Sequence, residues 1–171
     1  MNDAENIRKN AGLERAIEIA VSAHKGQVDK AGAPYILHPL RVMLSLSTKE
    51  ERIVGVLHDL VEDCEGWTFQ RLSEAGFSAE IIDALKSVTK YDAIKNPIIP
   101  KRPDNNADET YEEFVRRAAA NRIGAKVKRA DLMDNMDWSR ITEPTIKDLE
   151  RMIRYKKALA YLDNNTNASQ E

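Results

Sequence analysis

The sequence predicts an all-α fold, a single helical bundle of roughly seven or eight helices without a sheet. Apolar residues recur at three- and four-residue intervals along most of the chain, and capping signals precede several of these runs. No segment alternates between apolar and polar residues as a half-buried strand does. With 171 residues the chain can bury one core, so a single domain is expected.

The first helix is expected over about residues 4–24, where Gly26 breaks the apolar pattern. A loop over 29–34 follows. His38 and Pro39 are then expected to open the second helix, with proline at its first position, where the missing N–H is not needed.

The central helix is expected to begin at a capping box formed by Thr48 and Glu51, because their side chains can satisfy each other's free backbone amides. It is expected to continue through Asp63. Further helix starts are predicted at Thr68, Ser78 and Thr110, the last with a second capping box.

The last two helices are expected over about 123–136 and 145–162. The buried side of the final helix is expected to carry Leu149, Met152, Ile153, Leu159 and Tyr161. A long variable loop is predicted at about 90–109, because prolines and polar residues replace the helical pattern there. The domain is expected to span 1–163, followed by a frayed polar tail over 164–171.

Composition argues against a nucleic-acid-binding or membrane-bound protein. The formal net charge is −2 with 32% charged residues, so no strongly basic surface is expected. The chain shows no signal peptide and no apolar run of membrane-spanning length, and its single cysteine, Cys64, fits a reducing compartment. We therefore expect a cytoplasmic protein, whose oligomeric state the sequence does not reveal.

The central stretch places a histidine and three carboxylates in an apolar helical pattern. His58, Asp59, Glu62 and Asp63 fall within roughly 140° of arc at about 100° per residue. Burying these acids costs several kcal/mol unless a cation or strong hydrogen bonds compensate them. Imidazole and carboxylates are common ligands of divalent metals, so a metal site is the hypothesis that these residues favour.

The chain has only three histidines, and two of them complete a ligand set with two distant acids. We predict that one metal is held by His38, His58, Asp59 and Asp131. This mixture of nitrogen and oxygen ligands suits manganese, iron or zinc better than calcium.

The residues that follow the predicted ligands suggest hydrolysis of a phosphate ester or anhydride. Glu62 and Asp63 lie one turn beyond His58 and Asp59 and can position or deprotonate an attacking water. Asn135, one turn after Asp131, can donate to a ligand oxygen or orient a carboxylate.

Five ordered motifs carry a family resemblance. They are Ala23-His24-Lys25-Gly26-Gln27, Pro34-Tyr35-Ile36-Leu37-His38-Pro39, Leu57-His58-Asp59-Leu60-Val61-Glu62-Asp63, Val88-Thr89-Lys90 and Val127-Lys128-Arg129-Ala130-Asp131. Together they resemble the HD-superfamily hydrolase domain of the Rel/Spo enzymes in its stand-alone form, the small alarmone hydrolases. The resemblance covers about residues 10–160.

This resemblance implies an all-helical HD domain with one metal, usually Mn²⁺, that removes 3′-pyrophosphate from (p)ppGpp to give GDP or GTP. It implies the same four metal ligands and gives Glu62 and Asp63 the catalytic role. It also implies that Lys30 and Asn135 bind the nucleotide substrate, whereas His24 lies outside the metal set. Without a synthetase domain, the activity expected is hydrolysis alone.

Three residues depart from the family pattern. Asp29 stands where an arginine that stacks on guanine is common, Leu132 where arginine is usual, and Asp134 where histidine is frequent. A carboxylate cannot make the cation–π contact of arginine, so the metal chemistry carries over more directly than the identity of the base. Adenine alarmones or another 3′-phosphorylated nucleotide are alternative substrates. A broader HD nucleotide phosphohydrolase and a metal-stabilised binding protein are alternative functions.

Overall fold

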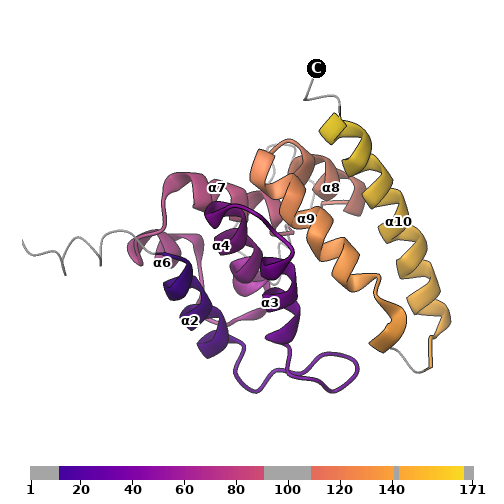
Figure 1. The fold of residues 1–171 in the computed structure, drawn as a ribbon, viewed down its shortest axis with the longest axis horizontal. Helices are drawn as coiled ribbons and strands as arrows, with labels where there is room; N and C mark the ends of the chain where they lie inside the picture. The colour runs from indigo at the N-terminus through magenta and orange to yellow at the C-terminus, as the bar shows by residue number, and fades with distance from the viewer. Residues whose placement is uncertain (1–11, 91–108, 141–142, 168–171) are drawn as a thin grey trace, which may run out of the picture.

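The computed structural model describes residues 12–90, 109–140 and 143–167. Its elements are α2 (Leu13–Ala23), α3 (Leu37–Leu44), α4 (Lys49–Leu57), α5 (Leu60–Asp63), α6 (Phe69–Glu74), α7 (Ala79–Val88), α8 (Tyr111–Ala119), α9 (Arg122–Asn135), the 3-10 helix η1 (Trp138–Arg140) and α10 (Ile146–Asn167) (Figure 1). Within these ranges the one β-type pairing is the isolated bridge between Val28 and Pro34. The all-α prediction is confirmed.

Two of the predicted segments fall largely outside the described residues. These are the beginning of the first helix, before residue 12, and the variable loop, of which 91–108 are not described. In the part of the chain that the structure describes, no helix is both long and apolar enough to cross a membrane.

Both predicted capping boxes are present. The Thr48 hydroxyl accepts from the Glu51 backbone N–H at 3.2 Å, and the Glu51 carboxylate accepts from the Thr48 N–H at 3.1 Å. Thr110 and Glu113 make the same reciprocal bonds at the start of α8. Each box satisfies backbone donors that a helix start would otherwise leave unpaired.

The helix boundaries differ from the prediction at two places in the first half of the chain. The predicted second helix begins at Leu37, so Pro39 is its third residue; the proline is tolerated because N–H groups of the first turn have no partner within the helix. The predicted central helix is split at His58 and Asp59 into α4 and α5.

The final helix differs from the prediction in its buried face and in its end. Leu149, Ile153 and Tyr161 are exposed, whereas Ala158 and Leu162 are buried. The reason is that α10 packs against α8 and α9 mainly through its C-terminal half, which selects a different stripe of the helix. The helix also continues to Asn167, beyond the predicted end at residue 162.

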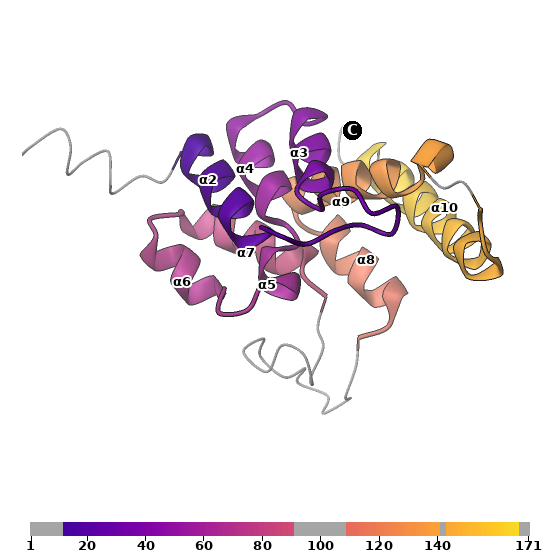
Figure 2. The same cartoon turned by 90° about the horizontal axis from the view of Figure 1, so that it is seen from below.

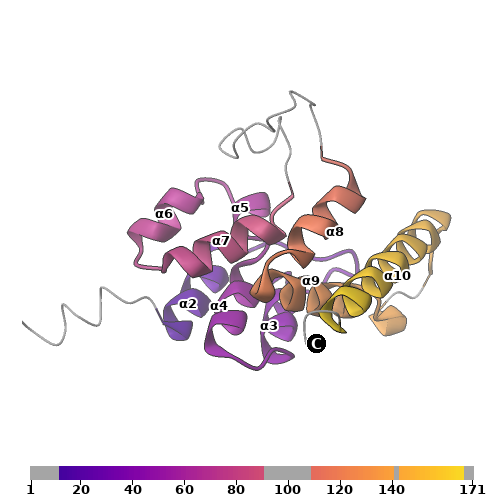
Figure 3. The same cartoon turned by 90° about the horizontal axis from the view of Figure 1, so that it is seen from above.

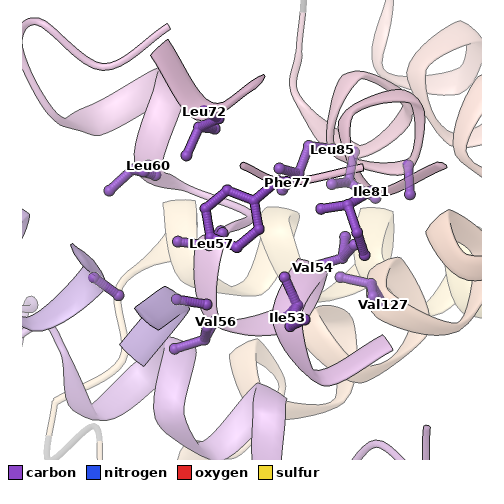
Figure 4. Packing of buried hydrophobic residues seen from close by; sticks show 14 of the residues in the cluster. Ile53, Val54, Val56, Leu57, Leu60, Leu72, Phe77, Ile81, Leu85 and Val127 are labelled. Carbon is purple, nitrogen blue, oxygen red and sulfur yellow. The ribbon is translucent and has the colours of Figure 1, made fainter. Parts of the chain in front are cut away.

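The main core surrounds α4, which contacts α2, α3, α7 and α9. Val54, Val56 and Leu57 of α4 are fully buried, and they pack among side chains of α7 and α9 such as Leu85 and Val127 (Figure 4). A smaller apolar cluster joins α8, α9 and α10 at the other end of the molecule (Figure 3). Helix α9 belongs to both clusters and therefore connects the two parts of the fold.

The connection between α2 and α3 runs along one side of the bundle toward α9 and α10 (Figure 2). Lys30 in this connection forms an ion pair with Asp148 of α10, with 3.5 Å between Nζ and Oδ1. The loop, the start of α10 and the C-terminal half of α9 thus lie on the same side of the molecule, where the candidate site is found.

Candidate active site

The first part of the site is the junction between α4 and α5. The His58 ring lies in the protein interior, and its Nδ1–H donates to the carbonyl oxygen of Gly55 at 2.9 Å. This bond fixes the tautomer of the neutral ring, in which Nε2 carries the lone pair. Nε2 is fully buried and has no hydrogen-bond partner among the described residues. An orphaned buried acceptor of this kind is rare in a folded protein and indicates an absent ligand.

His38 approaches the same point from α3. Its Nδ1–H donates to Asp134 Oδ2 at 2.7 Å, so its Nε2 also carries the lone pair. That nitrogen lies 3.3 Å from Asp131 Oδ1 and 3.5 Å from Asp59 Oδ2. Two imidazole lone pairs therefore converge on carboxylate oxygens.

The carboxylates come from two different elements. Asp131 lies on α9, and Asp59 lies at the junction before α5. From His58 Nε2 the distances are 3.0 Å to Asp59 Oδ2 and 3.6 Å to Asp131 Oδ1. The Tyr35 hydroxyl donates to Asp59 Oδ2 at 2.6 Å and holds that carboxylate in place.

These separations fit a single metal ion. Atoms bound about 2.1 Å from one metal at neighbouring positions lie about 3.0–3.4 Å apart. One donor atom each from His38, His58 and Asp131 lies within 4.8 Å of the other two, and Asp59 contacts both imidazoles. The imidazole lone pairs and the carboxylate oxygens that they face repel each other unless a cation or protons lie between them. The donor set therefore suits a divalent cation.

The electrostatics of the two rings support the same conclusion. Burial alone would lower the pKa of His38, but hydrogen bonds with the surrounding carboxylates outweigh it and raise the pKa to about 12. Burial would likewise lower the pKa of His58, but the nearby charges of Asp59 and Asp131 raise it to about 10. The site therefore favours positive charge at its centre.

Asp131 is held by two neighbours on its own helix. Lys128 Nζ lies 2.8 Å from Asp131 Oδ2, and the Asn135 amide donates both to the carbonyl oxygen and to the carboxylate of Asp131. Burial would raise the pKa of Asp131, but the Lys128 ammonium and both histidines hold it well below its usual range. Asp131 is thus an oriented, ionised carboxylate.

Glu62 and Asp63 lie on α5 at the edge of this cluster. Desolvation of the Glu62 carboxyl group and the charge of Asp59 raise its pKa to about 7, although the residue is exposed by surface area. The same two causes raise the pKa of Asp63. Glu62 also accepts a hydrogen bond from the backbone N–H of Lys90. Glu62 is therefore poised to take up a proton near neutral pH.

The cluster opens into a cavity of about 420 Å³. Asp29 and Lys30 of the α2–α3 connection line it, together with Asn135 of α9 and Arg151 and Tyr155 of α10. Lys30 and Arg151 lie on either side of Asp148, whose Oδ1 is 3.5 Å from Lys30 Nζ and 3.6 Å from Arg151 Nη1. The cavity therefore joins the His/Asp cluster to a rim that carries two cations, Lys30 and Arg151, as well as the carboxylates of Asp29 and Asp137.

The structure brings His38, His58, Asp59 and Asp131 together and places Lys30 and Asn135 in the lining of the cavity, whereas Glu62 and Asp63 lie on the neighbouring α5 outside that lining. Sequence reasoning assigned no contact in the site to Tyr35, Lys128 or Asp134, which contact the predicted residues. Tyr35 and Lys128 were visible in the ordered motifs, but nothing in the motifs assigned them a partner. His24 packs against Cys64, with 3.4 Å between Nδ1 and Sγ.

Comparison with known proteins identifies relatives over most of the chain. The HD domain family matches residues 16–154. A guanosine-3′,5′-bis(diphosphate) 3′-pyrophosphohydrolase of Aquifex aeolicus is 30% identical over 128 residues, which cover 72% of this chain and 17% of the relative. The protein of the same name from Borreliella burgdorferi is 36% identical over 126 residues, 71% of this chain and 18% of the relative. The chain thus spans less than a fifth of the length of these relatives.

A solved structure supports the fold. The structure of a metazoan ortholog of SpoT, described as hydrolysing ppGpp, superposes with a TM-score of 0.66 at 18% identity and covers 88% of this chain and 84% of its own. The resemblance that the five motifs indicate is confirmed by these relatives. With the family match over residues 16–154 and the helical fold, the chain belongs to the HD domain family.

Proposed function

We propose that this chain is a metal-dependent hydrolase that removes 3′-pyrophosphate from guanosine tetra- or pentaphosphate and leaves GDP or GTP. The observation that carries this proposal is the convergence of two imidazole nitrogens and two carboxylates beside an acidic pair and a cation-rimmed cavity. The Aquifex and Borreliella relatives bear the name of this reaction.

In this proposal His38, His58, Asp59 and Asp131 hold one divalent metal, Mn²⁺ by the resemblance. The orphaned Nε2 of His58 and the 3.0–3.6 Å separations among the donor atoms support this assignment. The chemistry that such a metal supplies is polarisation of a phosphoryl oxygen and acidification of water.

Glu62 and Asp63 act on the attacking water. Glu62, with a pKa raised to about 7, accepts a proton efficiently near neutral pH because a general base works best when its pKa is close to the working pH. Asp63 lies 3.5 Å from the Tyr35 hydroxyl, which also donates to Asp59. Tyr35 thus links Asp63 to Asp59, one of the proposed metal ligands.

Lys30, Arg151 and Asn135 bind the substrate nucleotide. The two cations at the rim share the single carboxylate of Asp148, so a polyphosphate gains more from them than an uncharged ligand does. Asn135 lines the cavity, and its amide also orients the carboxylate of Asp131. The same side chain therefore contacts both the proposed substrate site and one of the proposed metal ligands. We also propose a cytoplasmic location, where nucleotide substrates occur.

Asp29, which replaces the arginine common in the family, makes the adenine alarmone or another 3′-phosphorylated nucleotide the alternative substrate. Its Oδ1 accepts from the backbone N–H groups of Ala31 and Ala33, both at 2.9 Å, so this oxygen shapes the loop. The carboxylate also lines the cavity, where it cannot stack on guanine as an arginine does. Asp29 therefore affects which base the cavity prefers, and it leaves the proposed metal chemistry unchanged.

The test is an incubation of the Mn²⁺-loaded protein with guanosine tetraphosphate, its adenosine analogue and plain nucleotides, with products identified by chromatography. Pyrophosphate release from the guanosine compound is expected, and preference for the adenosine compound supports the alternative substrate. Exclusive release of orthophosphate would contradict the pyrophosphohydrolase. The control is the double variant Glu62→Gln with Asp63→Asn, which should bind metal but lose turnover.

A further inference from the structure

The side chain of His38 is held on both ring nitrogens. Its Nε2 faces Asp131 and Asp59, whereas its Nδ1–H donates to Asp134 at 2.7 Å. The proposed function gives a role to Nε2 alone, as a ligand of the metal. The second contact is as short as a charge-assisted hydrogen bond and lies in the protein interior, since the Asp134 side chain is 11% exposed.

Asp134 is itself fixed by Arg41. The guanidinium donates from Nε to Asp134 Oδ1 at 2.6 Å and from Nη2 to Oδ2 at 3.0 Å. This two-pronged pairing holds the plane of the carboxylate, because a guanidinium presents its donors in a rigid fork. Oδ2 of the same carboxylate accepts from His38, so the orientation of Asp134 sets the orientation of the imidazole.

The four residues form two matching pairs across one helix–helix contact. His38 and Arg41 are three apart on α3, and Asp131 and Asp134 are three apart on α9, so each pair lies on one helix face. Helices α3 and α9 pack against each other. The contact that brings His38 to Asp131 therefore also brings Arg41 and Asp134 to His38.

His58 provides an internal comparison. Its Nδ1–H donates to a neutral backbone carbonyl, that of Gly55, within its own helix. His38 instead donates to an anion from a different helix. A carboxylate partner holds the Nδ1–H tautomer and increases the basicity of Nε2 more than a neutral carbonyl does.

We propose that Asp134, held by Arg41, is a positioning residue that fixes the tautomer and orientation of His38 and thereby strengthens the binding of the metal. This inference rests on the proposed metal site and adds a residue at which the chain departs from the family pattern. Replacing such outer partners of a metal-binding histidine weakens metal affinity by about 10–100-fold.

The experiment measures Mn²⁺ affinity from the electron paramagnetic resonance signal of the free ion, for the full chain and for Asp134→Asn and Asp134→Ala. We expect about 10-fold weaker binding for the nearly isosteric asparagine, which lacks the charge, and a larger loss for alanine. The matched control is Asp137→Asn, one turn further along the chain, which removes the same charge without contacting His38 and should keep wild-type affinity.

A second readout follows the ring itself. Nitrogen-15 correlation spectra of the Zn²⁺-loaded protein report the Nδ1–H group of each imidazole, and only three histidines contribute. We expect the His38 Nδ1–H proton of the wild type to be shifted downfield by its hydrogen bond with Asp134 and Asp134→Ala to lose this shift, while His58 is unchanged. Thermal unfolding checks that the variants fold, and Asp134→Asn carries the test if the alanine variant does not.

The outcomes separate the two proposals. A wild-type chain that binds no divalent metal would overturn the proposed function and this inference with it. Wild-type metal affinity in both Asp134 variants, with an unchanged His38 Nδ1–H resonance, would overturn the positioning role and leave the proposed function standing. Equal losses in Asp134→Asn and Asp137→Asn would also overturn it, because they would show a general effect of charge.

Discussion

Replacing Glu51 with alanine is expected to lower the free energy of unfolding by about 2–3 kcal/mol. Glu51 is 1% exposed, and its Oε2 accepts from the backbone N–H groups of Ser47 at 3.2 Å and Thr48 at 3.1 Å. Losing the cap costs about 1 kcal/mol, and leaving partly buried amides unpaired costs about 1–2 kcal/mol more. The other oxygen, Oε1, accepts from Lys126 Nζ of α9 at 2.6 Å and joins the two helices.

The assay is thermal unfolding, in which this loss corresponds to a fall in Tm of about 4–12 °C for a chain of this size. The chain supplies a matched control in its second capping box. Glu113 makes the same reciprocal bonds with Thr110, but these bonds are exposed. Glu113→Ala should therefore cost only about 1 kcal/mol, or 2–4 °C. Equal losses in the two variants would refute the argument that burial and Lys126 make the first box stronger.

The pH dependence of the Glu51 variant has a definite sign. Burial would raise the pKa of Glu51, but hydrogen bonds from Lys126 and from the backbone of Thr48 and Ser47 outweigh it and lower the pKa below the usual 4.5. A carboxyl whose pKa is lower in the folded state contributes stability above its unfolded pKa. The difference between wild type and Glu51→Ala should be full at pH 7 and shrink as pH falls below about 4.5.

Four other perturbations test the site and the core. Removing the metal with a chelator should lower Tm, and Mn²⁺ at 100 times its Kd should restore about 2.7 kcal/mol, or about 5–10 °C, by thermal unfolding. Glu62→Gln should reduce kcat by about 10²-fold or more and remove the acidic limb of the pH–rate profile, which in the wild type rises toward about pH 7 because the base must be deprotonated. Lys30→Met should raise KM for the tetraphosphate more than it lowers kcat, since Lys30 lies at the cavity rim, away from the His/Asp cluster; an unchanged KM would contradict this. Gly124→Ala should destabilise the fold by about 1–2 kcal/mol in chemical denaturation, because a Cβ there would overlap Ser87 Oγ and lie 3.2 Å from the Ala118 carbonyl.

Local signals predicted the helix starts well. Thr48 with Glu51 and Thr110 with Glu113 cap their helices as predicted, because both partners of each box lie within one turn of the chain. The break after α4 could not be predicted in this way. It coincides with His58 and Asp59, where the His58 ring donates to the Gly55 carbonyl and its Nε2 lies 3.0 Å from Asp59 Oδ2.

The buried face of α10 shows a second limit of periodicity. Leu149 and Ile153 follow helical spacing as well as Ala158 and Leu162 do, so the sequence contains two apolar stripes. Which stripe is buried depends on how α10 meets α8 and α9: Ala158 and Leu162 are buried in that cluster, Tyr155 and Leu159 pack against it partly buried, and Leu149 and Ile153 are exposed. Amphipathic pattern alone does not distinguish the two, because each offers a similar apolar area.

The proposed ligands of the site were easier to single out from the sequence than some of the residues that hold them. His58 and Asp59 stand out because they are polar within an apolar helical pattern, and His38 and Asp131 lie in two further motifs of the chain. Two of the partners of these residues lie at long sequence separation. Tyr35 is 24 residues from Asp59, and Asp134 is 96 residues from His38.

The contact between α3 and α9 is nevertheless indicated by the spacing of polar residues in the sequence. Each helix carries two polar residues three apart on an otherwise core-facing side: His38 and Arg41 on α3, Asp131 and Asp134 on α9. The charges are complementary, so each helix alone would leave its pair uncompensated, and packing them together satisfies all four side chains. A positive pair on one helix and an acidic pair on another, both at one-turn spacing, therefore predict a helix–helix contact as well as a site. The experiment on Asp134 tests the roles within this contact, because it distinguishes Asp134, which orients His38, from Asp131, which is proposed to bind the metal together with His38.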